Sequence, residues 1–459
     1  MHRPESNHSS TPDLAVVIPA LNECPNLEQL LPQVTRAVRA LGITAEIVVV
    51  DGGSHDGTAQ VVERHGCRLI RQQQHGYGGA LLTGFAATTA PFVITMDADL
   101  AHPPELIPVL WASRNSADVL IASRYVQGGH TSGPAWRRLL SRVLNRAYSR
   151  VLSLPIRDLS SGYRLYRRTT LNGLSLRARD FDALEEILIR VYGEGWTIRE
   201  VPMGLQPRGA GQSHARVLRL GRAFLMTLVR MWRLRNSVLS ADYDNRAFDS
   251  PLWLQRHWQR TRYGIVMGML DGRNDILDVG CGSGRIIVDL PDAVGLDIVH
   301  RKLRWLRSHH RMVVRGSADQ LPFPDASFQC VVCSEVIEHI PDQPEVLGEM
   351  TRVLRPGGTL ILGTPDYSRR LWRTIEWIYG KVLPDAYADE HITHFTGASL
   401  ARRLRDAGYD ILQQRYLMGS VVIFKARKRV VSRTASNGKV GHPVDLAALP
   451  ASPVVARGA

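Results

Sequence analysis

Two carboxylates, Asp97 and Asp99, follow a short apolar run with β-branched residues, and Pro103 and Pro104 come soon after them. The apolar run predicts a buried strand, and the prolines end regular structure. Two Asp residues one position apart, where a strand gives way to a loop, can converge on one cation. Mg²⁺ and Mn²⁺ are commonly held by one or two carboxylates together with substrate phosphates. The pattern therefore indicates a Mg²⁺ or Mn²⁺ site and transfer from a nucleotide diphosphate, whereas an isolated Asp-X-Asp is more often a solvated surface turn.

Other acids and amides in this region also stand at the ends of expected strands. Strands are expected at residues 14–19, 46–51, 68–70 and 91–99. The polar residues at the ends of these strands are Asn22, Glu23, Asp51, Asp97 and Asp99. Strands that alternate with helices predict a parallel sheet with its ligand at the carboxyl ends of the strands. Such side chains can hydrogen-bond a ribose or a base, and Gly-rich turns admit phosphates. The alternative is that they cap helices, which suits Ser54 and Asp56 well.

The whole chain has the length and composition of a globular protein with two domains and tails. It has 459 residues, of which 44 % are hydrophobic and 22 % charged. The formal net charge of +14 favours anionic partners such as nucleotides, lipid phosphates or an acidic membrane surface. No helix-turn-helix, zinc-finger or RNA-stacking pattern occurs, so we expect no nucleic-acid partner. Five scattered cysteines predict a reducing compartment, and Cys330 and Cys333 are expected to be structural.

The two termini and the hydropathy pattern predict where the protein resides. Residues 1–12 are polar, and we expect them to be disordered. They lack the apolar core of a signal peptide. The sequence contains no run of about 18 uninterrupted apolar residues, so we expect no transmembrane helix. Residues 429–459 are rich in Ala, Pro, Val and Ser, and we expect a disordered tail. The protein is therefore expected in the cytoplasm, with peripheral attachment to the inner face of the cell membrane as a further hypothesis.

Residues 13–214 resemble the family 2 glycosyltransferases, and more narrowly the dolichyl-phosphate mannosyltransferase and polyprenyl-phosphate glycosyltransferase branch. The resemblance rests on several motifs: Pro19-Ala-Leu-Asn22-Glu23, Val50-Asp51-Gly-Gly-Ser54-His-Asp56-Gly-Thr58, Asp97-Ala-Asp99-Leu-Ala-His102, Ala122-Ser-Arg124-Tyr125, Arg137 with Ser141 and Asn145, Asp158 with Ser161-Gly-Tyr-Arg164, Glu186, and Pro207-Arg208 with Ser213-His214. It implies the GT-A nucleotide-diphospho-sugar transferase fold. It also implies inverting transfer of a hexose from a GDP- or UDP-sugar to a polyprenyl or dolichyl phosphate.

The same resemblance implies roles for individual residues. Residues near the nucleotide-sugar would be Pro19, Asn22, Glu23, Asp51, Asp56 and Gly78. Asp97 and Asp99 would hold the metal and the diphosphate, and the catalytic set would be Asp97, Asp99, Arg124 and Arg208. The acceptor phosphate would contact Arg124, Arg137, Ser141 and His214. Three residues differ from the family's usual ones, namely Gly52 for Asp, Ala101 for Gln and His214 for Lys. Water can replace the ligand lost at Ala101.

The need for a catalytic base depends on the acceptor. A lipid phosphate presents an oxyanion that is already a nucleophile, so arginines need only position it and neutralise charge. A hydroxyl acceptor would require a base, for which Asp158 and Glu186 are the candidates.

A basic amphipathic segment joins the two expected domains at residues 215–244. On a helix over 215–236, four arginines form one stripe (Arg219, Arg222, Arg230 and Arg233), and the opposite side carries Leu218, Leu220, Phe224, Leu225, Leu228 and Trp232. This composition suits a helix that lies in a membrane interface. The alternative is an ordinary helix that packs its apolar side on a domain.

A second Gly-rich turn begins after the expected strand that ends near Asp278. Gly280, Gly282 and Gly284 are spaced G-x-G-x-G, which disfavours a dinucleotide, and Asp297 ends the next strand about 20 residues later. With Asp319, Glu335 and Pro356-Gly-Gly358, the pattern over residues 245–428 resembles class I S-adenosylmethionine-dependent methyltransferases, which have a Rossmann-like fold. The resemblance places S-adenosylmethionine at Asp278, Gly280, Gly282, Gly284, Asp297, Asp319 and Glu335. The alternative is a structural α/β domain.

Methyl transfer from a sulfonium needs mainly alignment, although an oxygen acceptor would want a base. His339, His391 and His394 are the available histidines. Aromatic residues within 366–390 predict an acceptor lid or a membrane-facing insert. The chain is therefore expected to be a two-domain α/β bifunctional transferase that methylates a small molecule, glycan or lipid. The alternative is a methyltransferase with a catalytically silent sugar- or lipid-binding module. The departures from the family pattern at Gly52 and Ala101 support this alternative.

Overall fold

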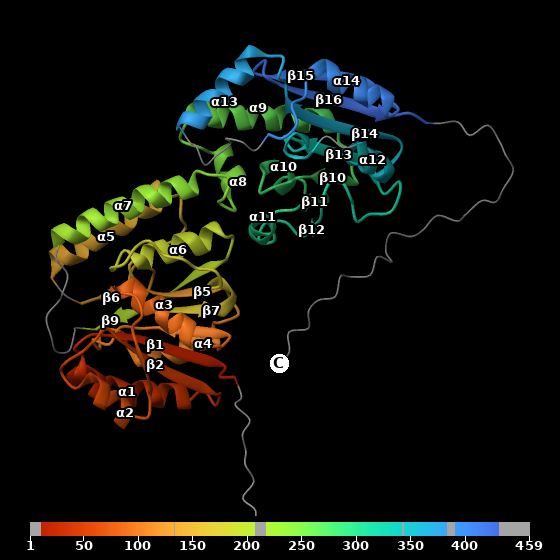
Figure 1. Cartoon of the computed structure of the whole chain (residues 1–459). Coiled ribbons are helices and arrows are strands. Elements are labelled where there is room, and N and C mark those ends of the chain that lie inside the picture. The colour runs from red at the N-terminus through yellow and green to blue at the C-terminus, as the bar shows by residue number, and fades with distance from the viewer. Residues whose placement is uncertain (1–10, 133, 207–216, 342–343, 383–390, 431–459) are drawn as a thin grey trace, which may run out of the picture.

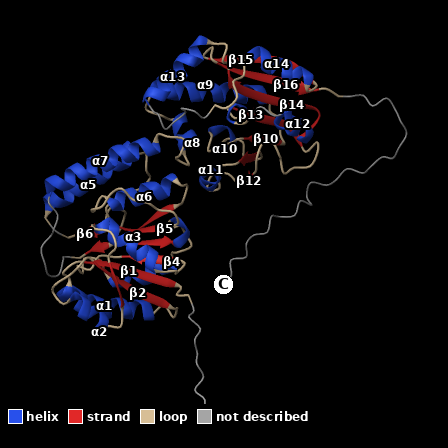
Figure 2. Cartoon of the chain, viewed as in Figure 1, coloured by secondary structure: helices blue, strands red, loops and turns tan. Residues whose placement is uncertain are grey.

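The computed structural model describes residues 11–132, 134–206, 217–341, 344–382 and 391–430. Two α/β bodies follow one another along the chain, each with a central seven-stranded sheet (Figure 1). Helices cover the sheets, as the secondary-structure colouring shows (Figure 2). The described part of the chain contains no helix that is long and apolar enough to cross a bilayer.

The first sheet has the strand order β3-β2-β1-β4-β7-β5-β8. Its strands are β1 (Leu14–Ala20), β2 (Ala45–Asp51), β3 (Arg68–Arg71), β4 (Phe92–Thr95), β5 (Val119–Ser123), β7 (Arg164–Arg167) and β8 (Ile198–Pro202). β7 runs antiparallel to both of its neighbours, and the other pairs are parallel. Because β1 pairs with β2 and β4 in parallel, the residues after these three strands share one edge of the sheet. A small separate sheet pairs β6 (His130–Thr131) with β9 (Gly204–Leu205).

Helices pack on both faces of the first sheet. One face packs against α1 (Cys24–Arg39), α2 (Thr58–Arg64), η1 (Pro104–Leu106) and α4 (Ile107–Ala112). The other packs against α3 (Tyr77–Ala87), α5 (Ala135–Val151), α6 (Ala183–Gly193) and α7 (Val217–Arg235), and η2 (Arg168–Thr170) follows β7. The buried Val, Ile and Leu of β1, β2 and β4 have no exposure to solvent on either face, as expected for a sheet covered by helices on both sides.

The second sheet has the order β12-β11-β10-β13-β14-β16-β15. Its strands are β10 (Ile276–Val279), β11 (Val294–Asp297), β12 (Val313–Arg315), β13 (Phe328–Ser334), β14 (Leu354–Pro365), β15 (Tyr409–Leu417) and β16 (Val421–Lys428). The first five pair in parallel, and β16 is antiparallel to both neighbours. Its other elements are α8 (Tyr243–Phe248), α9 (Trp253–Leu270), α10 (Arg285–Val288), α11 (His300–Leu306), η3 (Ile337–His339), α12 (Pro344–Val353), α13 (Arg370–Val382) and α14 (Gly397–Asp406). Cys330 and Cys333 are free and buried within β13.

Helix α7 is part of the first body rather than a free joint. Its Phe224, Leu228, Met231 and Leu234 pack in the core cluster that also contains α6 residues. Arg230, expected on the solvated stripe, instead points inward to Glu186 and to Thr227, which in turn donates to Asp182. A second apolar row of α7 stays exposed, namely Leu225, Met226, Val229 and Trp232. Helix α7 therefore packs on the first body, and the short stretch after Arg235 leads from it to α8.

That stretch is held by a buried ion pair. Arg235 is fully buried, and its Nη2 donates to Oδ2 of Asp242 at 2.7 Å while Nη1 donates to Ser240 at 2.7 Å. The two bodies also touch beyond the joint, because the guanidinium of Arg304 in α11 stacks on Trp196 with its Cζ 3.7 Å from the ring centroid. A Cβ at Gly195 would lie 2.5 Å from the carbonyl oxygen of Arg301. The two bodies are therefore directly packed against one another.

Candidate active sites

Asp97 lies just beyond β4 at the carboxyl edge of the first sheet, where two side chains orient it. The phenol of Tyr77, in the first turn of α3, donates to its Oδ1 at 2.8 Å. Nδ1 of His102 accepts the Asp97 amide N–H at 2.9 Å, so a neutral His102 carries its proton on Nε2. That Nε2 is 3.6 Å from Oδ2 of Asp97, whose side chain is 32 % exposed. The carboxylate is therefore held in a fixed direction while part of it remains open to a ligand.

Asp99 stands two residues further along, in a turn made by Leu100 with a left-handed φ of 64°. Its Oδ1 accepts the amide N–H of Ala101 at 3.1 Å, and its side chain is half-buried. Two partly exposed carboxylates are an oxygen donor set that fits Mg²⁺ or Mn²⁺. Among the described residues no third His, Cys, Asp or Glu joins them at ligand distance. The remaining ligands of such an ion would be water and the phosphates of the donor.

Asn22 and Asp51 follow β1 and β2 and connect the loops after these strands. The amide N–H of Asn22 donates to the hydroxyl of Ser54 at 2.8 Å, and that hydroxyl donates to Oδ1 of Asp51 at 2.5 Å. The side-chain oxygen of Asn22 accepts the amide N–H of His55 at 3.0 Å. The two predicted donor-binding residues are thus brought together through Ser54 at the ends of β1 and β2, where Pro19 pairs with Val50.

Glu23 and Asp56 have mainly structural contacts. The Glu23 carboxylate accepts from Asn26 at 2.5 Å. Asp56 accepts the amide N–H of Cys24 at 2.9 Å and the hydroxyl of Thr58 at 2.6 Å, which holds the starts of α1 and α2 together. Asp56 therefore joins the first residues of the two helices, although the N-cap positions belong to Glu23 and Gly57.

Gly78 packs closely against a neighbouring segment, and Glu186, one of the two candidate bases, forms ion pairs. A Cβ at Gly78 would lie 2.7 Å from Cβ of Ala183, and its amide N–H donates to the carbonyl of Arg179. This glycine allows α3 to approach the 178–183 segment, and its predicted place near the nucleotide-sugar stays a prediction. Glu186 is buried between Arg190 and Arg230, at 2.7 and 3.4 Å.

Arg124 lies in a polar cluster with Asp158, Ser160, Asn145 and Ser141. Its Nε and Nη2 donate to the two oxygens of the buried Asp158 at 2.8 and 2.6 Å, and Nη2 also donates to Ser160 at 2.8 Å. Asn145 donates to Ser160 at 3.0 Å and to the Ser141 hydroxyl at 3.4 Å. Burial disfavours the charge of Arg124, but the bonds to Asp158 outweigh it and raise its pKa. Arg124 and Ser141 are therefore brought together through Asn145 and Ser160.

Three predicted residues cannot be described in this way. Arg208 and His214 lie outside the described residues, and the same holds for the side chain of Arg137. Their roles stay predictions.

The Gly-rich turn of the second body follows β10 and is covered by protein side chains. Gly280 and Gly282 have left-handed φ values of 70° and 57°. A Cβ at Gly280 would lie 2.3 Å from Cγ2 of Val336, and one at Gly282 would lie 2.5 Å from Oδ2 of Asp244. Asp244, in α8, also accepts the amide N–H of Ser283 at 3.1 Å. These glycines are therefore required by close side-chain approach, and Gly284 precedes α10 at the end of the turn.

The acids predicted to bind the cofactor lie around this turn. Asp297 ends β11, and its two oxygens accept the amide N–H groups of Gly282 at 2.8 Å and Val299 at 2.7 Å. Asp278 is buried inside β10, and burial raises its pKa to about 7. Glu335, after β13, has a left-handed φ of 59° and forms an ion pair with Arg262. Asp319 is exposed after β12.

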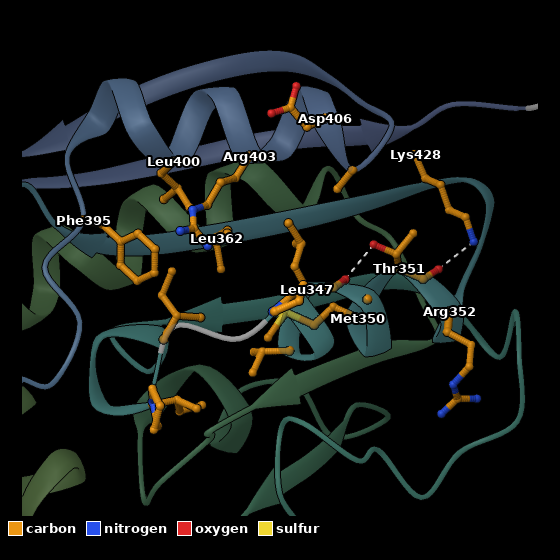
Figure 3. Close-up of a pocket in the computed structure, with 17 residues that line it drawn as sticks. Leu347, Met350, Thr351, Arg352, Leu362, Phe395, Leu400, Arg403, Asp406 and Lys428 are labelled. Carbon is orange, nitrogen blue, oxygen red and sulfur yellow. Dashed lines mark hydrogen bonds between the residues drawn. The ribbon is translucent and has the colours of Figure 1, made fainter.

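A separate apolar cavity of about 570 Å³ lies between α12, α14 and β14 in the second body. Leu347, Met350, Leu362, Phe395 and Leu400 point toward one another, and Lys428 lies at one end, where it donates to the carbonyl of Thr351 at 2.6 Å (Figure 3). None of the predicted cofactor-binding residues lines it. We therefore assign the cavity no part in binding the cofactor.

Four functional neighbours were not predicted from the sequence. They are Tyr77 and His102 at Asp97, and Asp244 and Arg262 at the second Gly-rich turn. Only His102 had a sequence signal, since it belongs to the Asp97 motif. The other three lie in different segments of the chain from the residues that they contact.

The geometry agrees with comparisons to known families. The family model of glycosyl transferase family 2 matches residues 15–174, and a methyltransferase domain model matches residues 253–414. The Pyrococcus furiosus protein named dolichol-phosphate mannosyltransferase is 35 % identical over 44 % of this chain and 58 % of its own length. Polyprenol monophosphomannose synthase of Mycolicibacterium smegmatis is 34 % identical over 43 % of this chain and 79 % of its own length. The chain thus spans about three fifths of the first relative's length.

Among solved structures, glucosyl-3-phosphoglycerate synthase from Mycobacterium tuberculosis is 22 % identical, covering 50 % of this chain and 86 % of its own, with a TM-score of 0.40. The two family models match separate parts of the chain, and each part contains one seven-stranded sheet. The fold prediction of a GT-A domain followed by a class I methyltransferase domain is confirmed. Through its first domain the chain belongs to the family 2 glycosyltransferases, and it carries a methyltransferase domain behind it.

Proposed function

We propose that the chain is a bifunctional transferase. Its first domain transfers a hexose from a GDP- or UDP-sugar to a polyprenyl or dolichyl phosphate with inversion, and its second domain transfers a methyl group from S-adenosylmethionine. The observation that carries the first activity is the shared strand edge, where the partly exposed Asp97 and Asp99 lie beyond β4 and Asn22 and Asp51 lie beyond its parallel neighbours. The names of the relatives, which act on dolichol or polyprenol phosphate, support the acceptor class.

Asp97 and Asp99 would hold Mg²⁺ or Mn²⁺, which neutralises charge on the departing diphosphate. The chain's own contribution is orientation, since Tyr77 and His102 fix the direction of the Asp97 carboxylate before any ligand arrives. Such preorganisation avoids a reorganisation cost when charge develops on the leaving group.

The ion pairs of Asp158 and Glu186, the two candidate bases, support a phosphate acceptor. Asp158 is bound by Arg124 at 2.6 Å, and Glu186 is bound by Arg190 and Arg230. Guanidinium groups occupy both oxygens of each carboxylate, so neither acid is free to approach the proton of an acceptor hydroxyl. A hydroxyl acceptor would need such a base, whereas a phosphate oxyanion does not. Arg124, Ser141 and the arginines at 137 and 208 would then position the acceptor phosphate.

A lipid acceptor requires the domain to reach a membrane, and two helices carry a suitable surface. Exposed apolar residues of α5 are Trp136, Leu139, Leu140 and Val143, and those of α7 are Leu225, Met226, Val229 and Trp232. The two helices lie side by side (Figure 1), and Tyr148 of α5 bonds the carbonyl of Phe224 in α7. Arginines on both helices, among them Arg138, Arg142 and Arg222, favour anionic lipid. We propose peripheral attachment through this face.

The charge around the second Gly-rich turn supports S-adenosylmethionine. Four acids lie around this turn, and two of them have basic partners, because Lys302 pairs with Asp244 and Arg262 pairs with Glu335. Among the described residues Asp278 and Asp297 form no ion pair with Lys or Arg, so these two carboxyls could offset the positive sulfonium and ammonium of S-adenosylmethionine. The methyl group would go to a small molecule, a glycan or a lipid.

Radiolabelled GDP- and UDP-sugars test the glycosyl transfer. The purified full chain is incubated with vesicles that contain polyprenyl phosphate and Mn²⁺, and we expect label in an organic-extractable, mild-acid-labile lipid. Asp99→Ala should abolish it, and Asp410→Ala, a surface pair with Arg429 in the second domain, serves as the control. No labelled lipid from the unmutated chain with any donor would contradict the proposal and favour a silent sugar- or lipid-binding module.

A further inference from the structure

A second cluster of metal-ligand side chains lies in the methyltransferase domain, formed by Glu338, His339 and His391. One ligand atom from each lies within 4.8 Å of the other two. Glu338 and His339 belong to η3, and His391 comes from a segment more than 50 residues later. The amide N–H groups of Ile392 and Thr393 both donate to the Glu338 carbonyl, at 2.8 and 3.0 Å. The backbone itself therefore fixes the two segments beside one another.

The oxygen ligand of this cluster is a carboxyl with almost no contact with water. Glu338 is 1 % exposed, and Thr364 donates to its Oε2 at 3.0 Å. A buried carboxylate is costly unless a charge or several hydrogen bonds compensate it. Among the described residues, no Lys or Arg forms an ion pair with Glu338. A divalent cation at this position would supply the missing compensation.

His391 has the supporting contacts of a metal ligand. Its Nδ1 lies 3.0 Å from Oε1 of Glu376 and 2.8 Å from the hydroxyl of Tyr367, which itself donates to Glu376 at 2.6 Å. The side chain of His391 is only 6 % exposed. A carboxylate on one ring nitrogen fixes the tautomer that leaves the other nitrogen for a metal. Glu376 and Tyr367 therefore present Nε2 of His391 as a ligand.

The cluster adjoins the proposed cofactor turn. Val336, two residues before Glu338, covers Gly280, and a Cβ at Gly280 would lie 2.3 Å from its Cγ2. The strands β10 and β13 that precede these two segments are parallel neighbours, so both segments lie at one edge of the sheet. An acceptor bound at the cluster would therefore lie near the cofactor.

We propose that Glu338, His339 and His391 form a divalent transition-metal site that binds the hydroxyl oxygen of the methyl acceptor. Two imidazoles and one carboxylate suit Mn²⁺, Fe²⁺, Co²⁺ or Zn²⁺ and leave coordination positions open. This role rests on the proposed methyl transfer. Coordination lowers the pKa of the hydroxyl, which releases its proton to solvent. The oxygen then forms a bond to the methyl carbon as the carbon–sulfur bond breaks, giving a methyl ether and S-adenosylhomocysteine. The histidines thus act as ligands instead of the base expected from the sequence.

Metal binding can be measured apart from methylation. The full chain carrying Asp97→Ala and Asp99→Ala, which removes the first-domain ligands, is dialysed against Mn²⁺, and bound metal is counted by mass spectrometry. We expect one bound ion per chain, with coupling to imidazole nitrogen in pulsed electron paramagnetic resonance. His391→Ala and Glu338→Gln should each lower the affinity at least tenfold. His309→Ala, a histidine stacked on Trp305 elsewhere in the domain, should leave it unchanged.

Glu376→Gln gives an independent readout, because loss of such a supporting carboxylate lowers metal affinity by about 10- to 100-fold while all three ligands remain. Absence of bound Mn²⁺, or bound Mn²⁺ without nitrogen coupling, in a chain that still binds S-adenosylmethionine would overturn the site. Binding of the metal with methyl transfer that persists after its complete removal would overturn the role given to it. Metal bound as expected in a chain that never binds S-adenosylmethionine would contradict the methyltransferase proposal and leave the site intact.

Discussion

Replacing Tyr77 by Phe tests whether the orientation of Asp97 matters to sugar transfer. The substitution removes only the hydroxyl that donates to Oδ1 of Asp97 at 2.8 Å, and the ring can keep its stacking on Phe181, whose centroid lies 4.8 Å away. A hydrogen bond to a charged group contributes about 1.5–3 kcal/mol. Because the Asp97 side chain is 32 % exposed and water can replace part of this bond, the lower end applies. We therefore expect about a tenfold effect.

The assay is the Mn²⁺ concentration that gives half-maximal sugar transfer, which reports on the first domain alone. This concentration should rise about tenfold in Tyr77→Phe, because the freed carboxylate must be reoriented as it binds the ion. Tyr409→Phe, which removes a hydroxyl bonded to Thr351 in the second domain, should change neither this concentration nor the rate. If Tyr77→Phe leaves the Mn²⁺ dependence within twofold of the unmutated chain, the reasoning about Asp97 is refuted.

Three further predictions concern the cofactor turn, the joint and the exposed helices. Asp297→Asn leaves one acceptor oxygen for the amide N–H groups of Gly282 and Val299. Titration calorimetry should therefore show about tenfold weaker binding of S-adenosylmethionine, and an unchanged affinity would contradict this. Arg235→Met leaves the buried Asp242 with a weaker partner and should cost about 3 kcal/mol of unfolding free energy, most of it restored by adding Asp242→Asn. Burial opposes ionisation of Asp242, but Arg235 lowers its pKa below the unfolded value of about 3.9. The stabilisation from this pair is therefore present above pH about 3.9 and is lost as the pH falls further. Arg235→Met should accordingly unfold in acid at a higher pH than the unmutated chain. Leu139→Glu with Trp232→Glu should reduce sedimentation with anionic vesicles without changing the melting temperature, and undiminished sedimentation would exclude this face as the attachment surface.

The sequence alone was sufficient to predict the folds of the two domains and the types of side chain at the carboxyl ends of their strands. Strand β11 has the expected end at Asp297, and the ends of β1 and β2 carry Asn22 and Asp51 as predicted. This succeeded because alternation of strands and helices is a local pattern, and parallel pairing then brings the strand ends to one edge whatever the details of packing.

Only the tertiary structure decided which side chains are engaged and with what. Tyr77 reaches Asp97 across 20 residues of sequence, and Glu338 meets His391 across 53. The binding of Arg124 to Asp158 depends in the same way on segments that are distant in the sequence. Local periodicity fixes which face of an element is buried, but contacts between distant segments depend on how whole elements pack. For that reason the sequence placed Asp97 at a strand end with His102 in the same motif, yet it could not identify Tyr77, whose phenol reaches Asp97 from α3.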